Sequence, residues 1–102
     1  MSNSNELFFR SFPTLCVGLA DRDVNFQLTP HLDGFAVLVR DENGLFEWDA
    51  VCHSTSYGHE DGLLETYGAI VDESKVLDTV EGWLTAEDVL ARVDQWLKTT
   101  SR

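Results

Sequence analysis

The chain has 102 residues, 43% of them hydrophobic, and its 18 acidic against 7 basic side chains give a formal net charge of −11. This length suits one domain, and the apolar fraction is too high for an intrinsically disordered chain. Direct binding to nucleic acid or to an anionic membrane is disfavoured, because both depend on clustered Lys and Arg side chains.

The N-terminal and cysteine patterns predict a cytoplasmic protein. The first six residues, Met-Ser-Asn-Ser-Asn-Glu, include neither the basic nor the apolar segment of a signal peptide. The longest apolar stretches, such as residues 35–39, are far shorter than the ~20 residues that span a bilayer. Cys16 and Cys52 match neither a disulfide scaffold nor a zinc site, so we expect both to be reduced thiols in the core.

The N-terminal third predicts a β-hairpin. An apolar run at residues 7–12 is compatible with a strand or a helical turn. Two segments of alternating apolar residues follow, at residues 14–20 and 24–28, separated by an Asp-Arg-Asp turn. Their alternating positions are Leu15, Val17, Leu19, Val24, Phe26 and Leu28.

Residues 34–53 carry the clearest strand signal and predict a second hairpin, because apolar residues alternate on both sides of an acidic turn at residues 41–44. The expected core-facing set is Phe35, Val37, Val39, Phe46, Trp48, Ala50 and Cys52. The other parity of the return strand, which suits a solvated face, contains Leu45, Glu47, Asp49, Val51 and His53.

Parity also predicts an even-numbered loop in this hairpin. Side chains that lie opposite each other in an antiparallel pair share a face of the sheet. A two-residue or four-residue loop places Val39 opposite Trp48 or Phe46, whereas a three-residue loop would place it opposite Glu47.

The C-terminal half predicts two further strands and a helix. A polar loop at residues 54–62 has glycines at two positions where special backbone angles are expected. Strand-like patterns follow at residues 63–71 and 76–80. Thr85 is the expected N-cap of the final helix, whose apolar face is Val89, Leu90, Val93, Trp96 and Leu97.

The fold predicted from these elements is α+β, an antiparallel meander of about five strands with the C-terminal helix packed across one face. It forms a single acidic domain over residues 1–102. On the polar face of the helix, Asp88 with Arg92 and Asp94 with Lys98 are expected to pair at i,i+4 spacing.

No catalytic residue, metal or cofactor is expected. Cys52, His53 and His59 have metal-ligand chemistry, but consecutive residues of a strand point to opposite faces. A catalytic thiol needs an electropositive setting that lowers its pKa, and the charge here is negative. Paired carboxylates are frequent in so acidic a chain and identify no acid–base catalyst.

Most of the negative charge lies in residues 41–94, which contain 14 acidic and 2 basic side chains. Such a surface can simply confer solubility. Alternatively, spaced carboxylates can imitate a phosphate backbone and occupy the basic groove of a nucleic-acid-acting protein, because complementary fields speed association and select partners.

The loop at residues 57–62 is the second candidate for binding, because an exposed aromatic flanked by glycines and acids is typical of an interface anchor. The alternative is a rigid connector whose Tyr57 folds back on the sheet. The residues expected to contact a protein partner are Tyr57, His59, Glu60, Asp61, Glu47, Asp49, Asp72 and Glu73.

Two segments resemble small accessory proteins of bacteriophages and prophages. They are Ser-Tyr-Gly-His-Glu-Asp-Gly-Leu-Leu-Glu at residues 56–65 and Val-Glu-Gly-Trp-Leu-Thr-Ala-Glu-Asp-Val-Leu at residues 80–90, within the C-terminal half. The resemblance implies an inhibitor of host defence, of the anti-restriction or anti-CRISPR type, that acts in the host cytoplasm. It carries over no catalytic residue.

Three hypotheses for function result. The first is a non-enzymatic, phage-type inhibitor that binds a basic surface of a host nucleic-acid-acting protein, with DNA mimicry as one way of doing so. The second is an immunity-type or regulatory protein that binds one toxin or enzyme by shape, with Tyr57 and exposed aliphatic side chains as anchors. The third is a small hydrolase or metal-dependent enzyme that uses Cys52, His53 or His59. A monomer and a homodimer formed through a sheet edge are both compatible with the sequence.

Overall fold

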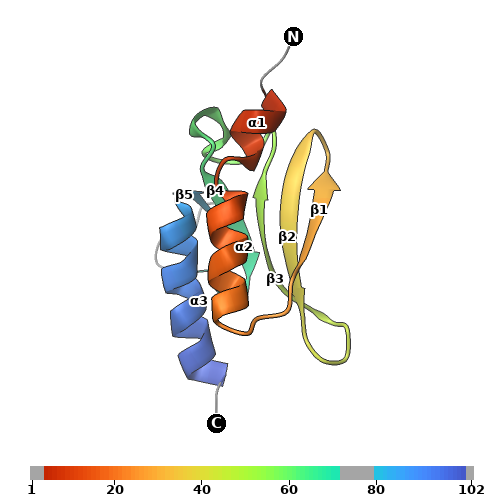
Figure 1. Ribbon diagram of the computed structural model, residues 1–102, viewed down its shortest axis with the longest axis vertical. Coiled ribbons are helices and arrows are strands. Elements are labelled where there is room, and N and C mark those ends of the chain that lie inside the picture. The colour runs from red at the N-terminus through yellow and green to blue at the C-terminus, as the bar shows by residue number, and fades with distance from the viewer. Residues whose placement is uncertain (1–3, 72–79, 101–102) are drawn as a thin grey trace.

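Five antiparallel strands form one sheet, and the two longer helices pack side by side on one of its faces (Figure 1). The computed structural model describes residues 4–71 and 80–100. In chain order the elements are α1 (Ser4–Phe9), α2 (Phe12–Asp21), β1 (Gln27–His31), β2 (Gly34–Arg40), β3 (Phe46–Cys52), the 3-10 turn η1 (His59–Asp61), β4 (Leu64–Gly68), β5 (Glu81–Leu84) and α3 (Ala86–Thr100). The strands neighbour one another in the order β1-β2-β3-β4-β5, which confirms the predicted α+β class and antiparallel meander with a C-terminal helix. None of the helices in the two described ranges is long and apolar enough to cross a bilayer.

The hairpin predicted over residues 14–28 is wrong, because helix α2 occupies its first half. Phe12, Leu15 and Leu19 are fully buried, and their spacing of three and four residues is the period of a helix. Leu15, Val17 and Leu19 also alternate like a strand, but Val17 is 63% exposed. α2 has a proline in its first turn. The missing N–H of this proline costs no hydrogen bond, because the first N–H groups of a helix have no acceptor within the helix.

The second predicted hairpin is confirmed as β2 and β3. Its aligned pairs are Val39 with Trp48, Val37 with Ala50 and Phe35 with Cys52. Trp48 and Val37 are fully buried, so the apolar parity of both strands faces the helices as expected. The buried face therefore determines the register of this hairpin.

A β-bulge at Glu47 makes the loop of this hairpin odd-numbered, so the prediction of an even-numbered loop is wrong. The Asp41 N–H donates to the Leu45 carbonyl over 2.8 Å, which leaves three residues at the tip. In a regular hairpin without the bulge, this three-residue loop would place Val39 opposite Glu47. The bulge skips Glu47 and brings Val39 opposite Trp48 instead, so the apolar pairing survives.

The same bulge turns Phe46 out of the core, where its parity in the sequence placed it. Phe46 pairs with Arg40, which alternates with the core residue Val39 and so lies on the other face of the sheet. The Phe46 side chain is 43% exposed. It stacks on Tyr67 of β4, with ring centroids 5.8 Å apart.

The alternate side chains of β3 that were predicted to face solvent do so only in part. Leu45 is exposed, and Glu47 and Asp49 are half-buried. Val51 and His53 are buried, contrary to the prediction. β3 is the central strand, so side chains of β2 and β4 flank its residues on both sides.

The core lies between the sheet and the helices. Gly18 of α2 faces Leu90 of α3 so closely that a Cβ atom on Gly18 would lie 2.4 Å from Leu90 Cδ1. Cys52 is buried there as predicted, and Cys16 is half-buried at the core edge, where burial raises the pKa of its thiol. The largest fully buried side chains are Trp48, Phe12, Leu15, Leu19, Leu64, Val37, Val39, Val89 and Val93.

The C-terminal half follows the prediction in β4 and α3. β4 confirms a strand within residues 63–71. The strand predicted at residues 76–80 lies outside the described residues, apart from its last residue. Thr85 caps α3 as expected: its Oγ1 accepts the Asp88 N–H, and Asp88 Oδ2 accepts the Thr85 N–H, each over 3.0 Å.

Charged side chains of α3 that were expected to pair along the helix reach other elements. Arg92 donates two hydrogen bonds of 3.0 and 2.6 Å to the buried carboxylate of Glu81 in β5. Asp94 accepts two from Arg22, which follows α2, and this pairing lowers the pKa of Asp94 with a smaller contribution from Lys98. These ion pairs therefore fix α3 to the sheet and to α2.

Candidate partner-binding surface

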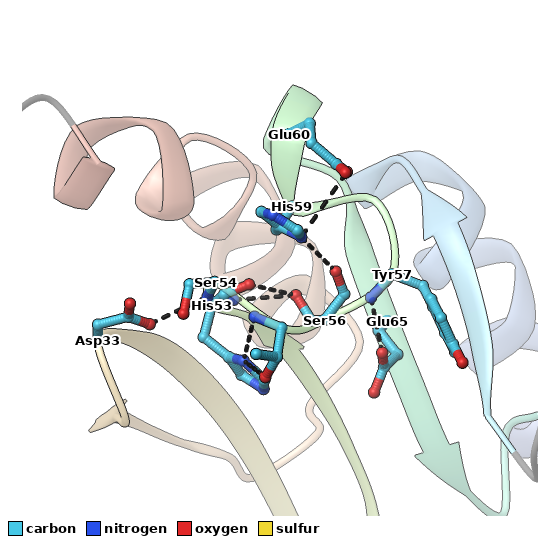
Figure 2. Close-up of polar contacts among 9 residues, drawn as sticks. Asp33, His53, Ser54, Ser56, Tyr57, His59, Glu60 and Glu65 are labelled. Atoms are coloured by element: carbon cyan, nitrogen blue, oxygen red, sulfur yellow. Dashed lines mark hydrogen bonds and ion pairs between the residues drawn. The ribbon is translucent and has the colours of Figure 1, made fainter.

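The loop at residues 54–63 is fixed by hydrogen bonds to the end of β3, to β4 and to the residue before α2, and Figure 2 shows those at His53 and at Glu65 of β4. Ser56 Oγ accepts the His53 N–H and donates to the His53 carbonyl, each over 2.9 Å. The Tyr57 N–H donates to Glu65 Oε1 of β4 over 2.8 Å. Ser11 Oγ, just before α2, donates to the Gly62 carbonyl over 2.7 Å. The loop is thus a preorganised platform on a rigid scaffold.

Both glycines of this loop adopt the special backbone angles that the sequence predicts. Gly58 has φ +99° and Gly62 has φ +70°, in the region that side chains rarely adopt. Space excludes a side chain as well, because a Cβ on Gly58 would lie 3.0 Å from the Trp83 Cα and one on Gly62 would lie 2.8 Å from the Leu7 carbonyl oxygen. The loop therefore packs directly on β5 and α1.

An exposed tryptophan stacks on the aromatic residue of the loop. The Tyr57 and Trp83 rings lie 5.1 Å apart and within 18° of parallel, and the Trp83 N–H donates to the Tyr57 carbonyl over 3.2 Å. Tyr57 is half-buried, and Trp83 is 52% exposed. Gly82 makes this contact possible, because a Cβ there would lie 2.3 Å from Tyr57 Cβ.

Trp83 lies in a second β-bulge and has a strained backbone. Leu64 pairs with Leu84 and Thr66 with Glu81, so both Gly82 and Trp83 face the one residue between them on β4. The φ of Trp83 is +57°, which for a bulky side chain is a clear outlier. Such outliers persist where the surroundings impose them, and they concentrate at functional sites.

The exposed charge of the loop comes from η1. Glu60 and Asp61 are exposed, as predicted for a charged rim. His59 is half-buried instead: its Nδ1 donates to the Ser56 carbonyl over 2.6 Å, and its ring meets Phe8 edge to face at 6.1 Å. His59 is therefore an anchor of the loop, with Nδ1 3.7 Å from a Glu60 carboxylate oxygen.

The turn between β1 and β2 joins this loop. Asp33 Oδ1 accepts the Ser54 N–H over 3.0 Å, and this hydrogen bond lowers the pKa of Asp33. The neighbouring Leu32 is 73% exposed and has φ +54°, at a turn position that usually needs glycine. His53 Nδ1 accepts the Thr55 N–H over 3.2 Å. We name the 54–63 loop, the Leu32–Asp33 turn and Trp83 together the loop end.

The side chains of Cys52, His53 and His59 do not come together in one site. Cys52 faces the helices, whereas His53 stacks edge to face on His31 at 5.3 Å. Burial raises the pKa of the Cys52 thiol to about 11, so it is protonated at neutral pH. Burial and the neighbouring His31 lower the pKa of His53. Within residues 4–71 and 80–100, no three His, Cys, Asp or Glu side chains gather as metal ligands would.

A second surface lies on the side of the sheet opposite α2 and α3, which we name the open face. Its side chains are Leu38, Arg40, Phe46, Asp49, Val51, Glu65 and Tyr67. Asp49 lies opposite Tyr67 and diagonal to Glu65. Burial and then the charge of Glu65 raise the pKa of Asp49 to about 6, against a hydrogen bond from the Tyr67 backbone.

The structure divides the predicted contact residues among several places. It brings Tyr57, Glu60 and Asp61 together at the loop end, with His59 beneath them. Asp49 belongs to the open face. Glu47, at the bulge, lines a cleft of about 420 Å³ between the hairpin tip and α3, together with Trp96 and Leu97. Asp72 and Glu73 lie outside the described residues.

Trp83 is a binding candidate that no pattern in the sequence singles out. Its exposure depends on the bulge in β5, and a bulge follows from how two strands pair. The available signal was a glycine directly before a tryptophan, just after the strand predicted at residues 76–80, because glycine inside a strand often marks a bulge or a close backbone approach.

Comparison with protein-family models, with curated protein sequences and with solved structures finds no match to this chain.

Proposed function

We propose that this domain binds one protein partner through the loop end, with Trp83 and Tyr57 as the aromatic anchor and Glu60 and Asp61 as the charged rim. The partner carries a basic surface, as a nucleic-acid-acting protein does, and the domain acts as its inhibitor. The resemblance to phage accessory proteins supports the inhibitor class. The observation that carries the proposal is the half-exposed Trp83, held at positive φ against Tyr57.

Exposed aromatic residues on rigid supports have the properties of interface hot spots. Trp and Tyr dominate the energy of protein interfaces, and charged residues surround such anchors as a rim. At the loop end the supports are the hydrogen bond that Ser11 donates and those that Ser56 and Glu65 accept, so little conformational entropy would be lost on binding.

Charge supports a basic partner. Two of the cations in the described ranges, Arg22 and Arg92, are held by Asp94 and Glu81. The exposed carboxylates at the loop end therefore face solvent in a strongly negative overall field, which would steer a basic surface toward them.

The immunity-type hypothesis is the second candidate, and the stacked aromatic pair favours it. A binding energy carried mainly by Trp83 would resist salt, whereas one carried by Glu60 and Asp61 would fall as salt screens the charges. DNA mimicry is a narrower form of the first hypothesis and requires ionised carboxylates in a phosphate-like array. Asp49, with its raised pKa, is a poor member of such an array near pH 6.

The test is capture of a partner from host lysate by the tagged protein, followed by titration calorimetry with the purified partner. We expect Trp83→Ala, and the double reversal Glu60→Lys with Asp61→Lys, each to weaken binding tenfold or more. Leu45→Ala, which removes an apolar side chain that is more exposed than Trp83 and lies in the hairpin tip at the other end of the molecule, is the matched control.

The matched control for charge is Asp21→Lys with Glu42→Lys, two exposed acids at the end of α2 and in the hairpin tip. An affinity that falls when the salt concentration rises from 50 to 300 mM supports the first hypothesis, a partner with a basic surface. Salt-resistant binding that still depends on Trp83 identifies the immunity-type form. A partner whose affinity is unchanged by both loop-end variants would overturn the proposal.

A further inference from the structure

The geometry points to a binding site for an arginine side chain on the open face, between the stacked Phe46–Tyr67 pair and the carboxylates of Asp49 and Glu65. The inference rests on the proposed function, since it names the chemistry of the partner surface that the domain receives. The occupant we propose is an arginine-bearing segment of that partner.

The site is built by the register of three strands. Asp49 of β3 lies directly opposite Tyr67 of β4, and Glu65 is two residues before Tyr67 on the same side of that strand. The bulge at Glu47 adds Phe46, which stacks on Tyr67 at 5.8 Å. Two carboxylates thus border an aromatic pair that is 43% and 48% exposed.

This combination matches a guanidinium group better than an ammonium group. A guanidinium is planar and weakly hydrated, so it stacks on aromatic rings while its N–H groups bind a carboxylate through two parallel hydrogen bonds. Glu65 Oε1 accepts the Tyr57 N–H, which fixes this carboxylate beside the site. Leu38, opposite Asp49 on β2, supplies an apolar flank for the methylene groups of the ligand.

Charge complementarity argues for a cation at this position. Two neighbouring carboxylates repel each other, and an incoming guanidinium removes that repulsion. The charged or titratable groups next to Asp49 on the open face are Arg40 from β2 and Glu65 and Tyr67 from β4, with His53 beyond Val51, just after β3. Counting Asp49 itself, two acids lie beside one permanent cation.

Binding should also release a proton. Because the pKa of Asp49 in the free protein is about 6, its carboxyl is largely neutral at pH 5 and largely ionised at pH 7.5. An arginine favours the ionised form, so affinity should rise with pH across this range, by about tenfold. In an Asp49→Asn variant most of this pH dependence should vanish, whereas dependence caused by His53 would remain.

The experiment is a titration of the ¹⁵N-labelled chain with a blocked tetra-arginine peptide, followed by amide chemical shifts, with tetra-citrulline as the neutral isostere. We expect saturable shifts at Asp49, Glu65 and Tyr67 with tetra-arginine alone. Asp49→Asn with Glu65→Gln should weaken binding at least fivefold. Glu6→Gln with Glu87→Gln removes the same charge from exposed positions on α1 and α3 and should change affinity less than twofold.

Phe46→Ala removes an exposed ring without touching a charge, so it keeps the test valid if the carboxylate double variant fails to fold. We expect it to weaken binding about threefold, as the loss of a cation–π contact would. Equal losses in the open-face and helix variants, or shifts confined to Glu60 and Asp61, would overturn the inference. The titration needs no partner, so its failure leaves the proposed function standing, and failure of the loop-end variants leaves this site standing.

Discussion

Trp83 has a backbone conformation that only glycine adopts without strain. The left-handed region costs other residues roughly 1–2 kcal/mol, whereas glycine in an ordinary strand is about 0.5–1 kcal/mol less stable than alanine. We therefore predict that Trp83→Gly is more stable than Trp83→Ala by about 1 kcal/mol, measured by urea denaturation. Leu38 in β2 is the control, where alanine should be the more stable substitution. The same order at both positions would contradict the strain at Trp83.

Asp49 should make the stability of the fold depend on pH. Its pKa is about 6 in the folded protein and near 3.8 in its ordinary state, so the folded form binds the proton more tightly. Stability contributed by the neutral carboxyl is therefore present below pH 4 and lost as pH rises to 6. Asp49→Asn should stabilise the protein by about 2 kcal/mol at pH 7.5 and little at pH 4. Denaturation at both pH values tests this, and equal effects would disprove it.

At this scale the sequence predicted the loop residues but not their individual roles. Tyr57, Glu60 and Asp61 were selected because glycines and acids surround an aromatic, and the structure places them together. His59 belongs to the same motif yet lies inward on Phe8. Trp83 lies 26 residues along the chain from Tyr57, so no local pattern could join the two rings.

Among the elements, the hairpin of β2 and β3 offers a test of its bulge. Deleting Glu47 removes the residue that has no partner and leaves Val39 opposite Trp48 and Arg40 opposite Phe46. We expect this deletion to fold, at a cost below about 2 kcal/mol. Deleting Asp49 instead would place Trp48 and Ala50 on opposite faces of the sheet, although both belong to the core. This variant should not fold cooperatively. Thermal denaturation followed by near-ultraviolet circular dichroism compares the two, and equal stability would refute this account of register.

Periodicity predicted the elements that have one strongly buried face. The β2–β3 hairpin alternates over many residues, so no other period fits it. The segment of α2 is short enough to fit both the strand period of two residues and the helix period of about 3.6 residues. Leu15 and Leu19, both buried, are four residues apart, and this spacing suits either structure. The contact between Gly18 and Leu90 on α3 favours the helix, and that contact is formed only in the tertiary structure.

At the scale of the whole molecule, charge should govern the behaviour of the free protein. A net charge of −11 is spread over principal extents of 49 × 27 × 22 Å, and like charges repel across that surface. We predict that raising salt from 20 to 300 mM increases the unfolding midpoint by about 5 °C, measured by scanning calorimetry. A variant with Glu6, Asp21 and Glu87 replaced by their amides should show a smaller rise. A midpoint that falls with salt would mean that the ion pairs of Arg22 and Arg92 outweigh the repulsion.

The hairpin tip and the loop end lie toward opposite ends of the long axis (Figure 1). The bulge near that tip has an evolutionary consequence. Inserting a single codon into a regular hairpin is enough to create it, and the inserted residue, Glu47, makes no pair in the sheet. Such an insertion leaves Val39 opposite Trp48 and Arg40 opposite Phe46, so it changes the length of the strand and not the face on which these side chains lie. The hairpin can thus gain or lose this one residue while its core face and its exposed face keep the same side chains.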